Sequence, residues 1–408
     1  MTNASRSLDE LCHLTAQSLV SLETTEHFQI IKMLGEGSYG QVKLAVHKKR
    51  GTPMALKFFP RESTGLLSFL REYNLSLAFC SHPSLTSALG IAFSTPEHYV
   101  FAQQPSLYGD LFDVIVSEVG LGEDCSQRVA SQLSGALSHL HRLGFVHRDL
   151  KPENVFLCDP QCRWVKLGDF GMAKARGIKV PCVWYSSAYC TPESEIVRET
   201  DEEVEVDGSG SEAGTMALDE NGNPVEVVVE VRRPKKQEQV WVSVEPSTDT
   251  WALGMLIYAM LTGVQPWAET ASDCRGYQLY KEWADHANEE MGNKNMMEDY
   301  DGQMIQEEGE EEEMDRDMNG NDNNNNNSSN VIASQFTFFT PLGCSLFLSL
   351  LHPDPELRGG AEEVMEHLGG SWLREEERRR REEEAAIRKQ RELMEEDDET
   401  ERVQSRDR

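Results

Sequence analysis

The spacing of apolar residues changes along the chain. From residue 28 to 104, short β-rich runs alternate with turn residues, and one helical stretch at 66–79 interrupts them. After Asp110 helical spacing dominates, most clearly over 125–143. The residues of that stretch that share one helix face are Val129, Leu133, Leu137 and Leu140. We therefore predict an α+β fold with a small, mostly β N-lobe containing one helix, joined near 103–109 to a larger, mostly α C-lobe.

Two acidic segments break this pattern. The first, about 194–246, contains RETDEEVEVDGSGSEAG and the Val-rich run VEVVVEVRRPKK, and the second, about 288–330, contains EEGEEEEMDRDMNGNDNNNNNSSN. Such compositions bury too little apolar surface to offset the entropy lost on ordering. We expect the second segment to be disordered and the first mostly so, with a local hairpin in the Val-rich run.

The chain ends in a run of alternating charges, residues 374–408, for which we predict a helix. Opposite charges four residues apart support it, and these pairs are Glu375 with Arg379, Glu376 with Arg380 and Glu384 with Arg388. Its apolar residues are too few for a coiled-coil seam. We expect a solvated, exposed helix, with partner binding as the alternative.

Charge and composition limit the partners. The 408 residues carry 39 Lys and Arg against 70 Asp and Glu, a formal net charge of -31, which repels nucleic acid and anionic membranes. We expect no nucleic-acid partner. With 39% hydrophobic residues, the chain can still build a sizeable core. Nothing in the sequence fixes the oligomeric state, and we expect a monomer.

No segment predicts membrane insertion or export. The first twenty residues lack a basic region followed by an unbroken apolar core, so they do not look like a secretory signal, and we expect a cytoplasmic protein. The apolar stretch at 336–351 is shorter than the roughly 20 residues that span a bilayer and contains Pro341 and Gly343. It predicts a buried core helix. The nine cysteines have no paired spacing, so we expect reduced thiols and no zinc site.

A glycine-rich stretch lies between two predicted strands, where glycines let backbone N–H groups approach phosphates. A dinucleotide-binding turn would continue into a helix, whereas VKLAVH at 42–47 alternates like a strand. An ordinary glycine-rich hairpin is the alternative. The residues proposed here for nucleotide binding are Leu34, Gly35, Glu36, Gly37, Ser38, Tyr39, Gly40, Gln41 and Val42.

Lys57 follows in the strand MALK, whose Ala55 can line an adenine pocket. The lysine supplies a fixed charge for the α and β phosphates, and it needs a carboxylate to hold it. Glu72, on the predicted helix, is the best candidate, because Glu62 lies too near Pro60 to be inside that helix.

Two further motifs are the most specific. His147-Arg148-Asp149-Leu150-Lys151-Pro152-Glu153-Asn154 precedes Asp169-Phe170-Gly171. Phosphoryl transfer needs a carboxylate to accept the proton of the acceptor hydroxyl, and oxygen ligands to hold Mg²⁺ against the phosphates. Asp149 suits the first role, and Asn154 with Asp169 the second. Lys151 can neutralise charge that develops on the transferred group.

Together these motifs resemble the protein kinase superfamily. The resemblance implies a bilobal kinase fold over 27–373, with the N-lobe at 27–103 and the C-lobe at 104–373, after an extension at 1–26. It also implies a bracing role for Asp249, a structural pair between Glu193 and Arg358, and a domain end near Trp372. ATP, Mg²⁺ and protein substrates are the implied cofactors and partners.

Leu150-Lys151-Pro152-Glu153 is similar to the serine/threonine branch of the superfamily. More narrowly, ALKFFPRESTGLLSFLREYNLSL, HYVFAQQPSLYGDLFDVI and GFVHRDLKPENVFL resemble the SH3-binding-domain kinase family. No two prolines here have the Pro-x-x-Pro spacing that an SH3 groove requires, so SH3 binding is not carried over.

The same resemblance assigns further residues. It puts Gln103 at the back of the ATP pocket, Gln104 to Ser106 in the hinge that reads adenine, and Asp110 facing the ribose or the substrate. Ser186 takes the position of a hydroxyl that bonds the catalytic Asp and Lys, while Tyr185 replaces a usual glycine. The resemblance of Arg148 suggests activation by phosphate, with candidate sites Ser186, Ser187 and Thr191. Asp110 and Glu153 suggest a mild preference for one Arg upstream of the acceptor, since Ala259 replaces a second acid.

The sequence therefore predicts an ATP-dependent serine/threonine protein kinase. A pseudokinase that binds nucleotide without turnover is one alternative, although no catalytic Lys or Asp is missing. The other is a scaffold that acts through its acidic insertions.

Overall fold

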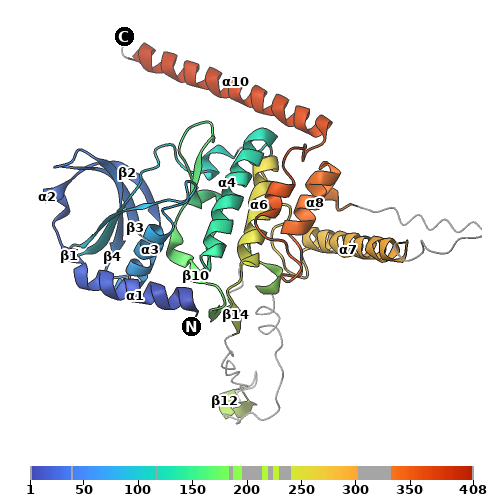
Figure 1. The fold of residues 1–408 in the computed structure, drawn as a ribbon, viewed down its shortest axis with the longest axis horizontal. Helices are drawn as coiled ribbons and strands as arrows, with labels where there is room; N and C mark the ends of the chain where they lie inside the picture. Colours follow the sequence, from blue (N-terminus) through green and yellow to red (C-terminus); the bar gives the residue numbers. More distant parts are fainter. Residues whose placement is uncertain are drawn as a thin grey trace, which may run out of the picture.

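The computed structural model describes residues 2–37, 40–115, 117–182, 187–194, 214–218, 224–228, 240–301 and 332–406. These residues form two unlike lobes (Figure 1), a sheet-based N-lobe and a helical C-lobe, as the spacing of apolar residues predicts. The protein therefore has a bilobal α+β fold, as predicted.

The N-lobe is built on a six-stranded sheet in the order β1-β5-β6-β4-β3-β2. Its strands are β1 (Val20–Ser21), β2 (Phe28–Gly37), β3 (Gly40–His47), β4 (Pro53–Pro60), β5 (Ala88–Ser94) and β6 (His98–Gln103). The edge strand β1 pairs with β5 in parallel, and the other neighbours are antiparallel. In β4 the six consecutive residues Met54 to Phe59 are buried, because β4 lies inside the sheet between β6 and β3 and apolar side chains cover both of its faces.

Two helices pack near this sheet. The helix α3 (Leu66–Ala78) matches the predicted stretch at 66–79 and buries Phe69, Leu70 and Leu75. The helix α1 (Asn3–Ser18) formed no part of the sequence prediction. It begins at Thr2, whose hydroxyl accepts a hydrogen bond from the Ser5 N–H, and it packs against α3. A single turn, α2 (Thr24–His27), precedes β2.

The C-lobe is a set of helices around one core. Its helices are α4 (Glu123–Arg142), α6 (Ser247–Thr262), α7 (Arg275–Asp301), α8 (Pro341–Leu350) and α9 (Glu363–Glu366). The four residues predicted to share the apolar face of α4 are all fully buried. In α6 every residue from Asp249 to Thr262 is buried, so this helix is the centre of the lobe.

Short strand pairs hold the loops between the helices. They are β7 (Phe145–Val146) with β10 (Lys174–Ala175), β8 (Val155–Leu157) with β9 (Val165–Leu167), and β11 (Lys179–Pro181) with β14 (Trp241–Ser243). Single turns of 3-10 helix include η1 (Phe112–Val114), η2 (Pro152–Asn154) and η3 (Phe170–Met172). These elements position the predicted site residues between the lobes.

The acidic segments are described only in part. β12 (Gly214–Leu218) and β13 (Pro224–Val228) form an antiparallel hairpin. Its second strand contains the start of the Val-rich run, as predicted, but its first strand lies before that run. The helix α7 continues to Asp301 and therefore enters the second predicted segment, for which we expected disorder from residue 288. The remaining disorder predictions, for 195–213, 219–223, 229–239 and 302–331, lie outside the described residues.

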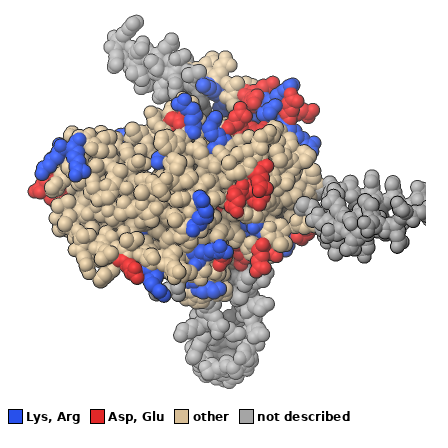
Figure 2. Space-filling model, in the orientation of Figure 1, with Lys and Arg blue, Asp and Glu red and all other residues tan. Residues whose placement is uncertain are grey.

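The tail forms one helix, α10 (Glu375–Arg406), as predicted. Its ion pairs agree with the prediction only in part: Arg379 pairs with Glu375, but Arg380 pairs with Glu377 at 2.7 Å and Glu384 at 2.6 Å, not with Glu376. In Figure 2 acidic and basic side chains are mixed where this helix begins.

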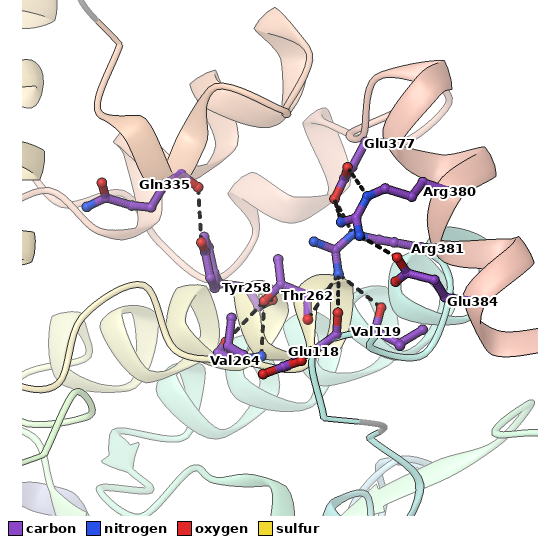
Figure 3. Close-up of polar contacts among 10 residues, drawn as sticks. All are labelled: Glu118, Val119, Tyr258, Thr262, Val264, Gln335, Glu377, Arg380, Arg381 and Glu384. Carbon is purple, nitrogen blue, oxygen red and sulfur yellow. Dashed lines mark hydrogen bonds and ion pairs between the residues drawn. The ribbon is translucent and has the colours of Figure 1, made fainter. Parts of the chain in front are cut away.

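The expectation that the whole tail is solvated is wrong at Arg381, which is 8% exposed. Its guanidinium donates to the carbonyl oxygens of Val119 at 3.1 Å, Thr262 at 3.0 Å and Glu118 at 3.4 Å (Figure 3). Thr262 is the last residue of α6, so the arginine satisfies a carbonyl that the helix end leaves unpaired. The start of α10 is therefore docked on the C-lobe.

The apolar stretch at 336–351 is largely buried, as predicted, although the helix occupies only its second part and Thr337, Pro341 and Ser345 are exposed. It contains α8, in which Gly343, Cys344, Leu346, Phe347 and Leu350 are buried. Among the helices of the described chain, none combines the length and the apolar character needed to cross a membrane.

Candidate active site

The glycine-rich stretch forms the hairpin between β2 and β3, where Gly37 pairs with Gly40. Gly40 has φ +133°, and a Cβ there would lie 1.9 Å from the carbonyl oxygen of Phe58, so only glycine fits. At Gly35 and Gly37 a Cβ would meet nothing within 4 Å, which leaves their backbone open to a ligand. Ser38 and Tyr39, at the tip, lie outside the described residues.

Lys57 of β4 lies between two carboxylates. Its Nζ is 2.6 Å from Glu72 Oε1 of α3 and 3.1 Å from Asp169 Oδ1, and its side chain is 10% exposed. Burial alone would lower the pKa of Lys57, but the two carboxylates outweigh burial and raise it. The lysine is therefore held charged between the lobes.

Asp149, Lys151 and Asn154 meet in the loop between β7 and β8. Lys151 Nζ lies 3.1 Å and 3.0 Å from the two carboxylate oxygens of Asp149. The amide nitrogen of Asn154 donates to the Asp149 carbonyl oxygen at 2.7 Å and to its Oδ2 at 2.9 Å. These contacts fix the orientation of the Asp149 carboxylate.

Asp169 caps η3 in the left-handed region, with φ 60°, and its Oδ1 accepts a hydrogen bond from the Gly171 N–H at 3.4 Å. Burial would raise the pKa of Asp169, whereas Lys57 and the Gly171 N–H lower it, and the net shift is downward. The next residue, Phe170, is fully buried and packs edge-on against Phe79, with ring centroids 5.0 Å apart. This packing anchors the segment under α3.

The loop that carries Asp149 is braced from below by Asp249 of α6. The buried carboxylate accepts hydrogen bonds from the N–H groups of His147 and Arg148, both at 2.7 Å, and from His141 at 2.8 Å. Arg148 has φ 67°, a strained conformation that these bonds hold in place. The bracing role implied for Asp249 is thus present in the contacts.

The pair implied between Glu193 and Arg358 is also present. Two parallel hydrogen bonds of 3.0 Å and 3.1 Å join the guanidinium and the carboxylate. The guanidinium also lies over the ring of Trp251, 4.9 Å from its centroid. Trp372, near which the resemblance places the end of the domain, is fully buried.

The connection between the lobes begins at Gln103, which pairs with Ala55 of β4 across the sheet. The N–H of Gln104 donates inward to the Ser87 carbonyl oxygen at 3.0 Å, and Pro105 has no N–H. Ser106 therefore has the first N–H in this connection that can serve a ligand, while Gln104 can offer its carbonyl oxygen.

Asp110 has a local role that the sequence did not predict. Its Oδ1 accepts hydrogen bonds from the N–H groups of Phe112 at 2.9 Å and Asp113 at 3.3 Å, which closes an Asx turn that leads into η1. Burial and the nearby Asp113 carboxylate raise the pKa of Asp110. The carboxylate still lies in the neighbourhood of Glu153, the other residue predicted to select an upstream Arg.

The candidate phosphorylation sites are only partly described. Tyr185 and Ser186 lie outside the described residues. The Ser187 hydroxyl accepts a hydrogen bond from the Tyr189 N–H at 3.2 Å. Thr191 is 5% exposed and its hydroxyl lies 3.0 Å from that of Ser194. In this conformation Thr191 is thus inaccessible to a modifying enzyme.

Asn154 and Asp169 fit a hard divalent cation. Because the Asn154 amide nitrogen donates to Asp149, the carbonyl oxygen of that amide is left as its ligand atom. The lowered pKa of Asp169 keeps its carboxylate ionised at neutral pH. Carboxylate and amide oxygens are the protein ligands that Mg²⁺ prefers, with water and phosphate oxygens completing the shell.

The fold and the arrangement of these residues define a protein kinase, and comparison with known proteins agrees. Residues 28–210 match the family model "Protein kinase domain". Over 366 residues the chain is 34% identical to "Serine/threonine-protein kinase SBK1" of Danio rerio, an alignment that covers 90% of this chain and 74% of that protein.

Two other relatives cover less of the chain. The chain is 37% identical to "Serine/threonine-protein kinase SBK2" of Rattus norvegicus over 65% of its own length and 62% of the relative's, and 30% identical to "Serine/threonine-protein kinase meng-po" of Drosophila melanogaster over 59% and 44%. The chain belongs to the SH3-binding-domain kinase family of serine/threonine-protein kinases.

Proposed function

We propose that the protein transfers the γ-phosphoryl group of ATP to serine or threonine hydroxyls of protein substrates. The observation that carries this proposal is that Lys57, Glu72 and Asp169 lie next to Asp149, Lys151 and Asn154. The two groups meet where the Gly168 N–H, beside Asp169, donates to the Asn154 carbonyl oxygen at 2.9 Å. This arrangement supports the proposal, because phosphoryl transfer requires a cation, metal ligands and a carboxylate base near one another, and none of these residue types is replaced.

The binding steps follow from the geometry of the N-lobe. The carbonyl oxygen of Gln104 and the N–H of Ser106 suit the edge of adenine, beside Ala55, while Gly35 and Gly37 leave room for phosphates. Lys57 supplies the positive charge for the α and β phosphates. Asn154 and Asp169 would hold Mg²⁺, which when bound neutralises phosphate charge.

In the transfer step Asp149 orients the acceptor hydroxyl and takes its proton as the oxygen bonds to the γ phosphorus. The bond from that phosphorus to the β–γ bridging oxygen breaks, and its electron pair leaves with ADP. Lys151, in contact with Asp149, can offset negative charge on the transferred group. The two hydrogen bonds from the Asn154 amide hold the Asp149 carboxylate in one orientation, so it need not reorient during transfer.

The alternative functions are a pseudokinase and a scaffold. The acidic insertions suggest the scaffold, because they could bind partners. Transfer of the γ-phosphoryl group separates the two classes, because a pseudokinase binds nucleotide without turnover. Hydrogen bonds among the polar side chains favour the enzyme: Lys57 contacts Glu72 and Asp169, and Asp149 contacts Lys151 and Asn154.

The test is transfer from radiolabelled ATP to a protein substrate by the full chain and by Asp149→Asn. We expect the variant to lose on the order of 100-fold or more in rate, because the amide cannot accept the proton. Asp124→Asn, the same change at an exposed position of α4, is the matched control and should keep the wild-type rate. Equal transfer by the wild type and Asp149→Asn would contradict the proposed mechanism.

A further inference from the structure

The helix α1 lies before residue 28, where the match to the kinase family model begins, yet it is part of the folded core. It runs beside α3 in Figure 1, and α3 carries Glu72. Leu8 and Cys12, one turn apart on α1, are 9% and 1% exposed and join the same core cluster as Phe69 and Leu70 of α3. Because α1 packs directly against α3, Leu8 and Cys12 extend the apolar core that α3 enters.

Polar contacts fix the register of this interface. Asp9 forms an ion pair with Arg71 of α3 at 3.0 Å. Asn74, which is 4% exposed, accepts a hydrogen bond from the Thr15 hydroxyl at 3.0 Å and donates to Cys12 Sγ at 3.7 Å. A buried amide with these partners allows little sliding of one helix along the other.

The side of α3 that contacts α1 is turned away from Glu72. Arg71 and Asn74 are three residues apart and share one side of the helix. Glu72 lies two residues before Asn74, about 200° around the axis at 3.6 residues per turn. Thus α1 supports α3 from behind, while Glu72 points forward to Lys57, 2.6 Å away.

Both ends of the N-terminal segment are anchored, and on different lobes. At its start Ala4 lies against Gly144, where an added Cβ would come within 3.3 Å of the alanine methyl group, and Thr2 lies near Gly177. At its end β1 pairs with β5, and the Leu22 N–H donates to the Ser94 carbonyl oxygen at 2.9 Å. The segment therefore spans from the loops that follow α4 and β10 to the edge of the N-lobe sheet.

We propose that α1 is a built-in activating element, in which Leu8, Asp9 and Cys12 hold α3 where Glu72 reaches Lys57. The proposal rests on the proposed phosphoryl transfer. Outward movement of α3 would break the Lys57–Glu72 ion pair and the α1 contacts together, so α1 packing is thermodynamically linked to the state with the ion pair intact. The residues of α1 are positioning residues, since they act through Glu72.

Leu8→Asp in the full chain tests the apolar contact, with Leu14→Asp as the matched control because Leu14 is 61% exposed on the same helix. We expect Leu8→Asp to lower kcat/KM for ATP about tenfold, the effect of a tenfold smaller competent population. Hydrogen exchange of 66–78 should become faster in that variant. Leu14→Asp should leave both measurements at wild-type values.

A charge exchange tests the ion pair with a milder change. Asp9→Arg places two cations together and should lower kcat/KM for ATP about threefold, as expected for a partly exposed pair. The double variant Asp9→Arg/Arg71→Asp restores opposite charges and should recover most of the rate. If the double variant recovers no activity, the ion pair between Asp9 and Arg71 does not support the position of α3.

The decisive measurement is a double-mutant cycle with Glu72→Gln. If α1 acts through Glu72, Leu8→Asp should change kcat/KM little in the Glu72→Gln background. An equal tenfold loss in both backgrounds, or unchanged exchange of 66–78 in Leu8→Asp, would overturn the proposal. If the wild-type chain transfers no phosphoryl group, the proposed function is refuted instead. The hydrogen-exchange rates of residues 66–78 would then still show whether α1 holds α3 in place.

Discussion

At the scale of single residues, Lys57 forms ion pairs with two carboxylates, Glu72 and Asp169, in a poorly solvated site. Lys57→Met would leave Glu72 and Asp169 facing each other without a cation, and we expect it to destabilise the fold by roughly 3 kcal/mol. Glu72→Gln leaves Lys57 paired with Asp169 and should destabilise by about 1 kcal/mol. Urea unfolding measures both, with exposed Lys49→Met as the control. The reverse order would contradict this account of the charges.

Asp249 gives a prediction for pH. Burial would raise the pKa of Asp249, but hydrogen bonds from His141 and from backbone N–H groups, with nearby positive charge, lower it. A carboxyl whose pKa is lower in the folded chain stabilises the fold above its unfolded pKa of about 3.9 and loses this contribution as pH falls through the folded value.

Asp249→Asn should therefore unfold in less urea than the wild type at pH 7, and the difference should narrow below about pH 4. Unfolding curves between pH 3 and pH 7 provide the measurement. Asp124→Asn, at an exposed position, should show no comparable narrowing. A difference that stays constant down to pH 3 would show that the Asp249 charge does not carry the effect.

At the scale of elements, the spacing of apolar residues along the chain predicted those helices that contacts within one short segment determine. The helices α3 and α4 agree with the predicted stretches because their apolar residues repeat within a single element. The site residues could be nominated for a related reason, since phosphoryl-transfer chemistry calls for particular residue types at fixed spacing within short motifs. Only the folded chain, however, shows that Asp110 uses its carboxylate to cap a turn.

The packing partners of the two terminal helices, α1 and α10, could not be predicted from the sequence. Thr2 at the cap and Leu8 with Cys12 one turn apart were the available signals for α1, but they do not identify α3 as its partner. In α10 the sequence presents a row of similar arginines. Burial of Arg381 rather than Arg380 depends on carbonyl groups of residues 119 and 262, far away in the sequence.

That difference between neighbouring arginines is testable. Arg381→Ala removes the donor to buried carbonyl groups and the contact with Phe338, and we expect a loss of about 2 to 4 kcal/mol. Arg380→Ala removes only ion pairs of a half-exposed side chain and should cost less than about 1 kcal/mol. Thermal unfolding and proteolysis of the tail compare the two. Similar losses would contradict docking of α10 through Arg381.

At the scale of the whole molecule, the first acidic insertion leaves and rejoins the kinase fold at neighbouring points. Cys182 contacts both sides of it: the thiol donates to the Ser194 carbonyl oxygen at 3.9 Å, and the N–H donates to the Val240 carbonyl oxygen at 2.8 Å. The hairpin of β12 and β13 forms a sheet of its own. The two ends of the insertion are therefore close enough for a short linker to join them, which would leave the rest of the kinase fold intact.

Replacing 195–239 with a six-residue Gly/Ser linker shortens this loop by about three doublings, each worth about 0.6 kcal/mol of closure entropy. We expect the shortened chain to be more stable by about 2 kcal/mol and to keep phosphoryl transfer, with urea unfolding and radiolabel transfer as the measurements. A variant with 195–239 scrambled keeps the loop length and should show wild-type stability. If the linker variant folds but no longer transfers phosphate, the insertion belongs to the catalytic unit. If both variants keep activity but lose a binding partner of the wild type, the insertion acts as a scaffold beside an independent catalytic unit.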